Sequence, residues 1–428
     1  MPFFSSFVGS LERDGLLKVI ERPVSPEYEV TQITGGSVEP SLFTDVSGRR
    51  VAVNVLGTRE MLSRALGIPV DQMARTLAAI QSGGVVNVVD ESPSMDVVME
   101  VNLGELPILT HYSGDSGAYI TAGIVISEYE GVTNASIHRL MAIGRDKLVA
   151  RIVEGRHTDS LYQRARRDHE PLPVAIAIGV DPVTLYAVCT RVPEGREFHF
   201  ASALKGKPVE LFKCNNGLTV PHCEILLEGY LDPEEVHAEG PFVDITGTYD
   251  SVREQPVIHI NRISHRRDPI YHAILPAGGE HRVLMGVPYE PLIYREASRF
   301  AEVTNVVMSD GGCSYLHAVV QITKRSNSEV KDVIEAAFKA HNSLKHVVVV
   351  DDDIDILDPS DVEYAIATRV QADHDIHIYT GQRGSSLDPS RKPDGTTTKM
   401  GIDATCELDK RGEYLRAVGA VNLQSTNS

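Results

Sequence analysis

Apolar residues recur with two different periods along this chain. Before about residue 105, a helix-type stretch from Thr58 to Ala78 is interrupted at Gly67-Ile68-Pro69, and short apolar runs from Arg50 to Leu56 and from Gly84 to Val89 lie on either side of it. A 3.6-residue period predicts an amphipathic helix, and a short apolar run predicts a buried strand. The pattern therefore predicts a small α/β domain at the start of the chain.

The central segment, from about residue 110 to residue 290, is dominated by short strand-like runs with turn residues between them. This pattern is typical of a barrel or a sandwich. A few helices are inserted, among them His157 to Arg167, with Thr158 or Asp159 near its N-cap. The predicted strands are Ile120 to Glu128, Lys147 to Val153, Pro173 to Gly179, Pro208 to Lys213, Glu224 to Leu231, Phe242 to Gly247 and Val257 to Ile263.

From Pro288 onward the period changes again, and predicted helices alternate with predicted strands. The helices are Glu290 to Glu302 and Ser328 to His341, and the strands are Leu316 to Ile322 and His346 to Val350. The later stretch from Gly381 to Lys399 is rich in Gly, Ser, Pro and Asp, which predicts a mobile loop. We therefore predict three domains: an N-terminal α/β domain at residues 1–109, a strand-rich domain at 110–289, and a C-terminal α/β domain with a mobile tail at 290–428.

Composition narrows the class of protein. The chain has 41 Lys and Arg residues against 59 Asp and Glu residues, and its formal charge of −18 weighs against nucleic acid as the main partner. The 5 cysteines include no CxxC pair, so reduced thiols are expected. No basic leader opens the chain, and no apolar run reaches the roughly 18 residues of a membrane span. These features predict a cytoplasmic protein with no membrane partner.

Chemically useful groups gather in the stretch from Thr133 to Arg139 and again from Glu154 to His157, next to strand-like segments. Asn134, His157 and Glu197 offer an amide oxygen, an imidazole and a carboxylate, a mixed set that suits Mn²⁺ or Mg²⁺. Spacing alone does not group these three residues. With 16 histidines in the chain, a single histidine is more often a surface or core residue than a ligand.

Carboxylates are paired or clustered at two further places. Glu239 and Asp244 flank a Gly-Pro-Phe-Val segment, where one acid can deliver a proton while the other stays ionised, and Arg139 is the candidate that tunes them. The alternative interpretation is a solvated loop with ordinary surface acids. The run Asp351 to Asp355 could bind a divalent cation, although helix caps and solvated turns are the commoner use of such acids.

Several separate motifs together resemble one known family, the UbiD-type decarboxylases, which are reversible carboxy-lyases that use prenylated FMN. The resemblance runs in order through roughly residues 110 to 410. Its motifs are T-N-A-S-I-H-R at 133–139, R-H at 156–157, K-G-K-P-V-E-L-F-K-C at 205–214, C-E-I-L-L-E-G at 223–229, A-E-G-P-F-V-D-I-T-G at 238–247 and I-N-R-I-S at 260–264.

The resemblance implies a fold and a set of site residues. The strand-rich domain would be a split β-barrel that binds flavin, placed between two α/β domains, in a chain that assembles as a homodimer or a homohexamer. Asn134, His157 and Glu197 would be the metal ligands, holding Mn²⁺ or Mg²⁺, with K⁺ nearby, against the flavin phosphate. The residues expected to contact the cofactor are Asn134, Ala135, Ser136, Ile137, His138, Arg139, Arg151, Ile152, Val153, Arg156, His157, Glu197 and Lys399.

The resemblance also implies the chemistry. Arg139, Glu239 and Asp244 would be the catalytic residues, with Asp244 standing where the cinnamate-type branch of the family has glutamate. Losing CO₂ leaves electrons on carbon, and no side chain accepts them, so a cofactor must. A flavin prenyltransferase would supply that cofactor.

The substrate is the least constrained part of the interpretation. The chain resembles the shorter archaeal-type members, among them the enzyme that decarboxylates trans-anhydromevalonate 5-phosphate to isopentenyl phosphate in a mevalonate route. His138, a cationic or hydrogen-bonding group, would suit a phosphorylated enoic acid. The alternative is an aromatic or heteroaromatic acid such as a hydroxybenzoate or a furoate. A flavin reductase and a non-catalytic carboxylase subunit are two further alternatives.

Overall fold

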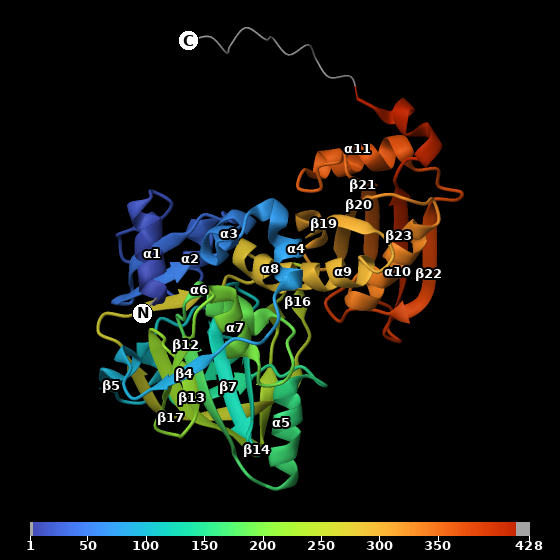
Figure 1. The fold of residues 1–428 in the computed structure, drawn as a ribbon. Coiled ribbons are helices and arrows are strands. Elements are labelled where there is room, and N and C mark those ends of the chain that lie inside the picture. Colours follow the sequence, from blue (N-terminus) through green and yellow to red (C-terminus); the bar gives the residue numbers. More distant parts are fainter. Residues whose placement is uncertain (1–2, 417–428) are drawn as a thin grey trace, which may run out of the picture. The chain divides into compact units, whose positions relative to one another are not determined.

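The computed structural model describes residues 3–416, which form two compact units. The first contains the chain up to Pro291 together with two short segments, Cys313–Tyr315 and Ser386–Pro389, and the second contains the rest. Figure 1 follows the chain from α1 (Phe4–Arg13) to β23 (Thr396–Ala404). None of the helices in this described range is both long enough and apolar enough to cross a membrane.

A four-stranded sheet in the order β1-β2-β3-β18 contains most of the N-terminal strands. The strand β18 (Ile270–Ala273) pairs in parallel with β3, so a much later segment completes this sheet. The predicted interruption of the helical stretch is confirmed, because Gly67 ends α3 in a left-handed conformation with φ of 68°. The other elements of this region are β1 (Lys18–Ile20), α2 (Glu29–Thr34), β2 (Ser41–Val46), β3 (Arg49–Val53), α3 (Arg59–Leu66) and α4 (Met73–Ala79).

A nine-stranded sheet forms the centre of the first unit, in the order β6-β9-β10-β17-β14-β11-β7-β8, with β5 paired to β17. Its strands are β5 (Val97–Met99), β6 (Tyr119–Ile120), β7 (Gly123–Tyr129), β8 (Val132–Ile137), β9 (Leu140–Ile143), β10 (Lys147–Ala150), β11 (Leu172–Ile178), β14 (Ile225–Glu239) and β17 (Arg253–His265). The predicted strand-rich centre of an α/β protein is therefore confirmed.

Both faces of this sheet are buried. Along β11, Val174, Ile176 and Ile178 pack into one apolar cluster, while Ala175 and Ala177 pack into another on the opposite face. Alternate residues of a strand point to opposite faces, so a strand covered on both sides reads as one continuous apolar run. The covering elements include β4 (Val86–Val89), α5 (His157–Arg167), α6 (Pro182–Cys189), α7 (Glu197–Lys205), β12 (Val209–Lys213) and β13 (Thr219–Pro221).

Three short elements complete the first unit: the two-stranded hairpin of β15 (Phe242–Val243) and β16 (Tyr249–Asp250), and the helix α8 (Gly279–Gly286). The N-cap of α5 is Arg156, and Thr158 and Asp159 lie in its first turn. There the carboxylate of Asp159 accepts the N–H of Gly155 at 2.8 Å. The helix α9 (Glu290–Ala297) begins where the first unit ends.

The second unit is built on a five-stranded sheet in the order β19-β20-β21-β23-β22. Its three inner strands run parallel, and both edge strands are antiparallel to their neighbours. The elements are β19 (Glu302–Met308), β20 (His317–Thr323), α10 (Glu329–Ala340), β21 (His346–Asp351), α11 (Pro359–Arg369), β22 (Ile376–Arg383) and β23 (Thr396–Ala404).

The loop predicted from Gly381 to Lys399 is wrong at both ends, because β22 continues to Arg383 and β23 begins at Thr396, pairing in antiparallel register. In the run from Asp351 to Asp355, Arg369 donates to Asp351 and to Asp353 at 2.7 Å each. The acids of this run are thus used in ion pairs and turns.

Candidate active site

Arg139 lies between β8 and β9, and its guanidinium binds two acids that are far away in sequence. Nε donates to Oε1 of Glu239 at 2.8 Å, and Nη2 donates to Oε2 of the same carboxylate at 2.9 Å. Nη1 donates to Oδ2 of Asp244 at 3.3 Å. The structure thus brings together the three residues that were expected to be catalytic.

A third acid, Asp250, completes this cluster, and the sequence analysis missed it. Its Oδ2 accepts from Nη2 of Arg139 at 3.1 Å, and Arg253 donates to both of its oxygens, at 2.6 and 2.7 Å. Burial opposes the ionisation of Asp250, but the hydrogen bonds from Arg253 and the charge of Arg139 outweigh it and lower its pKa. The feature that could have identified Asp250 is the hairpin of residues 242–250, because Asp250 pairs across it with Phe242.

The acids differ in their access to solvent. The side chain of Glu239 is fully buried and that of Arg139 is 10% exposed, whereas that of Asp244 is 18% exposed. The guanidinium lies over the ring of Phe242 at 5.2 Å, and this ring packs on Tyr119 at 4.2 Å. A buried carboxylate is tolerated only with a well-placed partner, and Arg139 provides that partner for Glu239. Asp244 is the more accessible acid of the two that were predicted.

His281, at the start of α8, is a neutral imidazole within the electrostatic reach of this cluster. Its Nδ1 accepts the N–H of Ala277 at 3.1 Å, which leaves the proton on Nε2. Burial lowers its pKa, the charge of Asp244 raises it, and the charges of Arg139 and Arg282 lower it further. A neutral imidazole with one N–H can donate a hydrogen bond near Asp244 without adding charge.

The three expected metal ligands come from β8 and from the first residues of α5 and α7. Nδ1 of His157 lies 3.9 Å from Oε1 of Glu197, a spacing that two ligands of one ion can adopt. The amide of Asn134 donates to Thr158 at 2.8 Å and to Ser136 at 3.1 Å, so its Oδ1 remains available as a donor to a metal. Burial raises the pKa of Glu197 to about 7, which a nearby cation would reverse.

His138 is held inside a hydrogen-bond network and is not a free cation. Its Nδ1 lies 3.0 Å from the carbonyl of Arg151, and its Nε2 lies 2.9 Å from the hydroxyls of Ser136 and Thr158. A carbonyl can only accept, so Nδ1 carries the proton and Nε2 accepts from a hydroxyl. Burial lowers the pKa of His138, which favours the hydrogen-bonding role over the cationic one, and its contact with a substrate stays a prediction.

The segment after β10 presents a half-buried guanidinium. Arg151 donates from its backbone to the carbonyl of Arg139 at 3.1 Å and from Nη1 to the carbonyl of Ile152 at 2.7 Å. Burial and the charges of Arg253 and Arg139 lower its pKa. Among the described residues no carboxylate forms an ion pair with Arg151, so this cation is free to bind an anion.

The remaining expected cofactor residues lie in different environments. Ala135 is buried in the core, Ile137 is half-buried, and Val153 and Arg156 are exposed. Lys399 belongs to the second unit.

There Lys399 lies in β23, where its ammonium donates to the carbonyl of Asn342 at 2.7 Å and stands 5.1 Å from the ring centre of Phe338. Burial lowers its pKa to about 8. Its approach to a flavin phosphate stays a prediction.

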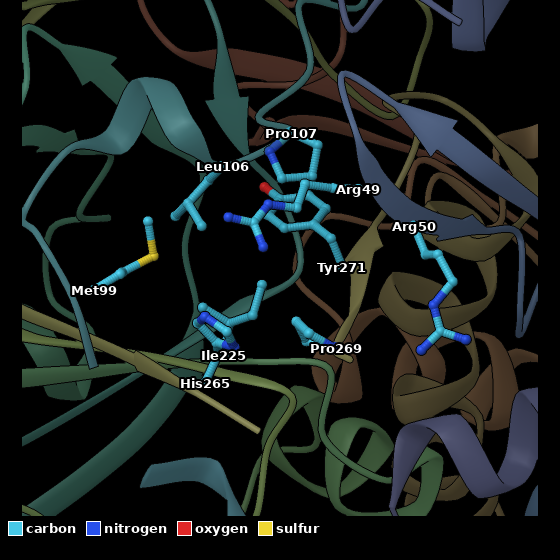
Figure 2. A pocket seen from close by; sticks show the side chains of 9 residues that line it. All are labelled: Arg49, Arg50, Met99, Leu106, Pro107, Ile225, His265, Pro269 and Tyr271. Atoms are coloured by element: carbon cyan, nitrogen blue, oxygen red, sulfur yellow. The ribbon is translucent and has the colours of Figure 1, made fainter. Parts of the chain in front are cut away.

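A small pocket elsewhere in the first unit contains none of the expected residues (Figure 2). It offers about 10 Å³ of free volume, roughly the space of one water molecule. The hydroxyl of Tyr271, which is buried there, has no hydrogen-bond partner among the described residues. The lining residues are Arg49, Arg50, Met99, Leu106, Pro107, Ile225, His265, Pro269 and Tyr271. This pocket suits a bound water better than a substrate.

Comparison with known proteins gives one consistent answer. Models of the three domains of UbiD, the 3-octaprenyl-4-hydroxybenzoate carboxy-lyase, match residues 8–80 (N-terminal domain), 87–279 (Rift-related domain) and 282–404 (C-terminal domain). The domain boundaries predicted at residues 109 and 289 stay predictions. A relative from Methanosarcina mazei named anhydromevalonate phosphate decarboxylase is 56% identical, over 97% of this chain and 99% of its own length.

Solved structures agree with the family models. The UbiD-class enzyme HmfF from Pelotomaculum thermopropionicum in complex with FMN is 36% identical, with a TM-score of 0.93 over 99% of this chain and 98% of that one. An evolved dimeric form of the same enzyme in complex with prFMN is 34% identical, with a TM-score of 0.89 over the same shares of the two chains. The chain therefore belongs to the UbiD family of carboxy-lyases.

Proposed function

We propose that this protein is a prenylated-FMN-dependent, non-oxidative decarboxylase that converts trans-anhydromevalonate 5-phosphate to isopentenyl phosphate. The observation that carries the proposal is the contact of Arg139 with both Glu239 and Asp244, in a chain 56% identical to a protein named for that activity. The reaction is reversible in principle, and the proposed direction is loss of CO₂.

The residues present fit the cofactor. The half-buried guanidinium of Arg151, which no carboxylate neutralises among the described residues, suits the flavin phosphate. Asn134, His157 and Glu197 would hold Mn²⁺ or Mg²⁺ at that phosphate, with K⁺ nearby, since together they offer one nitrogen and two oxygen donors. Prenylated FMN, when bound, supplies the electron sink that decarboxylation requires.

The side chains handle the carboxylate and the proton. Arg139 orients the substrate carboxylate by charge-assisted hydrogen bonds, and its pairing with Glu239 holds the guanidinium in place. After the C–C bond to the carboxylate breaks and CO₂ leaves, Asp244 donates the proton that takes its place on carbon, and solvent restores that proton. The greater exposure of Asp244 makes it the donor, because buried Glu239 is bound by two hydrogen bonds from Arg139.

Two alternatives from other functional classes would make different use of the same residues. A flavin reductase or a non-catalytic subunit has no need for a buried Arg139 that holds three carboxylates. An aromatic or heteroaromatic acid would use the same chemistry, and only substrate tests separate it from the phosphorylated acid. We further propose a cytoplasmic homodimer or homohexamer that depends on a flavin prenyltransferase for its cofactor.

The test uses protein co-expressed with a flavin prenyltransferase and handled without oxygen. It is incubated with trans-anhydromevalonate 5-phosphate and, in parallel, with a panel of aromatic acids, and CO₂ release is measured. Release from the phosphorylated acid alone supports the proposal, and Asp244→Asn should then lose about 10²- to 10⁴-fold in rate while keeping its flavin. Release from an aromatic acid alone would overturn the proposed substrate. Loss of both flavin and fold in Asp244→Asn would point to a structural role instead.

A further inference from the structure

Buried polar atoms without hydrogen-bond partners gather beside the catalytic candidates. They are both ring nitrogens of His111 and Oδ1 of Asp115, none of which has a partner among the described residues. The side chains of both residues are fully buried, with Nδ1 of His111 3.9 Å from Oδ2 of Asp115. Unsatisfied buried groups cost free energy and are uncommon, so each needs a physical reason.

His111 and Asp115 belong to a turn, residues 111–116, that packs against the segment carrying the catalytic acids. We call that segment, residues 239–250, the acid loop. The N–H of Ser116 donates to the carbonyl of Pro241 at 3.0 Å, and the N–H of Gly114 donates to the hydroxyl of Tyr249 at 3.1 Å. A Cβ atom at Gly114 would lie 2.6 Å from that hydroxyl, so the turn and the Tyr249 side chain are in close contact.

Asp115 closes the 111–116 turn. Its Oδ2 accepts the N–H of Tyr112 at 2.9 Å and that of His111 at 3.2 Å. Burial raises the pKa of this carboxyl, whereas the N–H groups of the turn, the N–H of Val243 and the charge of Arg139 act in the opposite direction. The turn that Asp115 closes contacts the acid loop at Pro241 and Tyr249, which lie on either side of Asp244 in the sequence.

The ring of His111 supports the same assembly from another side. It meets the ring of Phe242 edge-on, with 5.9 Å between centroids and 88° between planes. Phe242 in turn lies under the guanidinium of Arg139 at 5.2 Å. The 111–116 turn therefore contacts the acid loop at Pro241, Phe242 and Tyr249, around the position of Asp244.

We propose that Asp115 is a positioning residue that fixes the acid loop so that Asp244 stays opposite Arg139. A buried carboxylate is a poor choice for stability alone, because an apolar residue of similar size avoids its desolvation. The buried carboxylate of Asp115 has a role because it closes the turn that contacts the acid loop. The inference rests on the proposed function, since it assigns Asp115 to the step in which Asp244 delivers a proton.

The first test compares Asp115→Ala with Asp115→Asn in flavin-loaded enzyme. The alanine variant loses both hydrogen bonds that close the turn, and kcat should fall about 10- to 100-fold while KM and flavin content stay within about twofold. The asparagine variant keeps an acceptor oxygen and should recover kcat to within about threefold. Wild-type kcat in the alanine variant would overturn the proposal.

A matched control is Asp181→Ala, which removes another buried aspartate that accepts a backbone N–H. Asp181 caps α6 through Thr184 at 3.2 Å and pairs with Lys205 at 2.7 Å, away from the acid loop. This variant should lose thermal stability and keep its kcat. An equal loss of kcat in both alanine variants would mean that a general loss of stability explains the effect, against the proposal.

The second test asks whether Asp115 acts through Asp244. In an Asp244→Asn background, Asp115→Ala should cause no further loss of the residual rate, because the residue it positions has already been disabled. A full multiplicative loss in that background would overturn the inference.

The third test does not depend on turnover. Amide hydrogen exchange of the acid loop should rise at least tenfold in Asp115→Ala and stay near wild type in Asp115→Asn. Unchanged exchange in the alanine variant would overturn the inference. If exchange rises in Asp115→Ala but the wild-type protein releases no CO₂ from any acid, the proposed function is wrong and the positioning role of Asp115 still holds.

Discussion

Arg139 and Glu239, which lie 100 positions apart in sequence, are joined by two hydrogen bonds of 2.8 and 2.9 Å in which one guanidinium edge faces one carboxylate. Such a two-point pair fixes the orientation of the guanidinium as well as its charge. The remaining nitrogen, Nη1, is thereby aimed at Asp244. This geometry makes specific demands on residue type.

Arg139→Lys should therefore be a severe change, even though it keeps the charge. Lysine offers a point charge without the planar fork that binds Glu239 by two hydrogen bonds and aims Nη1 at Asp244, so kcat should fall by about 100-fold or more. Glu239 stays buried with a poorer partner, and the free energy of unfolding should drop by roughly 1–3 kcal/mol. Steady-state rates and denaturant melts of the flavin-loaded protein measure the two effects. A variant with wild-type kcat would show that the fork geometry is not needed.

Glu197→Gln tests the proposed metal site. An amide at this position is a weaker ligand than a carboxylate, so the variant should bind Mn²⁺ about 10- to 100-fold more weakly. If the ion holds the flavin phosphate, metal and flavin should be lost together, and a chelator should release flavin from the wild type. Metal analysis and flavin absorbance measure this. Full flavin retention in a metal-free variant would show that the metal is not needed to bind the cofactor.

The His138→Ala variant tests whether the imidazole has a structural role or binds the substrate as a cation. The neutral ring links Ser136 and Thr158 to the carbonyl of Arg151, so its loss should cost about 1–3 kcal/mol of stability. KM for the phosphorylated acid should change by less than about threefold at pH 7, because no charge is removed.

The pH dependence gives a second measurement on His138. The pKa of His138 is lowered in the folded state. Its contribution to the free energy of unfolding is therefore complete above pH 6.5 and is lost as the pH falls below that value. The stability difference between wild type and His138→Ala should therefore shrink on acidification. A tenfold rise in KM, or a difference that grows at low pH, would restore the cationic interpretation.

Lys399→Met should stabilise the second unit. Burial lowers the pKa of Lys399 from 10.5 to about 8, so at pH 7 the folded protein carries a charge in a site that disfavours it. Each unit of pKa is worth about 1.4 kcal/mol, and the lost contacts with Asn342 and Phe338 offset part of the gain, so a net gain of about 1–2 kcal/mol is expected.

The sign of the pH dependence follows from the direction of that shift. Between about pH 8 and 10.5 the unfolded chain binds more protons at Lys399, so wild-type stability rises with pH across this window. The advantage of Lys399→Met should therefore decline from pH 8 upward. Thermal melts at pH 7 and pH 10 measure this, and loss of flavin in the variant would show that the lysine is kept for the cofactor at the expense of stability.

The strands were the most predictable part of this protein. The run from Leu172 to Ile178 is apolar at almost every position because both faces of β11 are covered, and such a run indicates a buried strand without further information. Thr396 to Ala404 was missed because polar, Gly-rich residues precede it, and its burial comes from packing inside the second unit.

The site was less predictable, for a geometric reason. The short Gly-Pro-Phe-Val segment paired Glu239 with Asp244, but nothing in the local sequence places Arg139 beside them, and the resemblance to a family was needed to strengthen that grouping. Asp250 was missed because its role depends on the hairpin that places it beside Arg139. The sequence left the role of His138 open between a cation and a hydrogen-bonding group for a similar reason, since charge in an imidazole depends on burial and on partners that the fold supplies.

The strand β18 has a consequence for the order in which this protein is made. It supplies the fourth strand of a sheet whose other three strands come from the first residues of the chain, with Ile270 next to Arg50. During synthesis, β3 emerges from the ribosome long before its parallel neighbour exists, and its edge remains unpaired in that interval. A fragment that ends before Ile270 should therefore aggregate, and adding the missing segment as a separate peptide should rescue it.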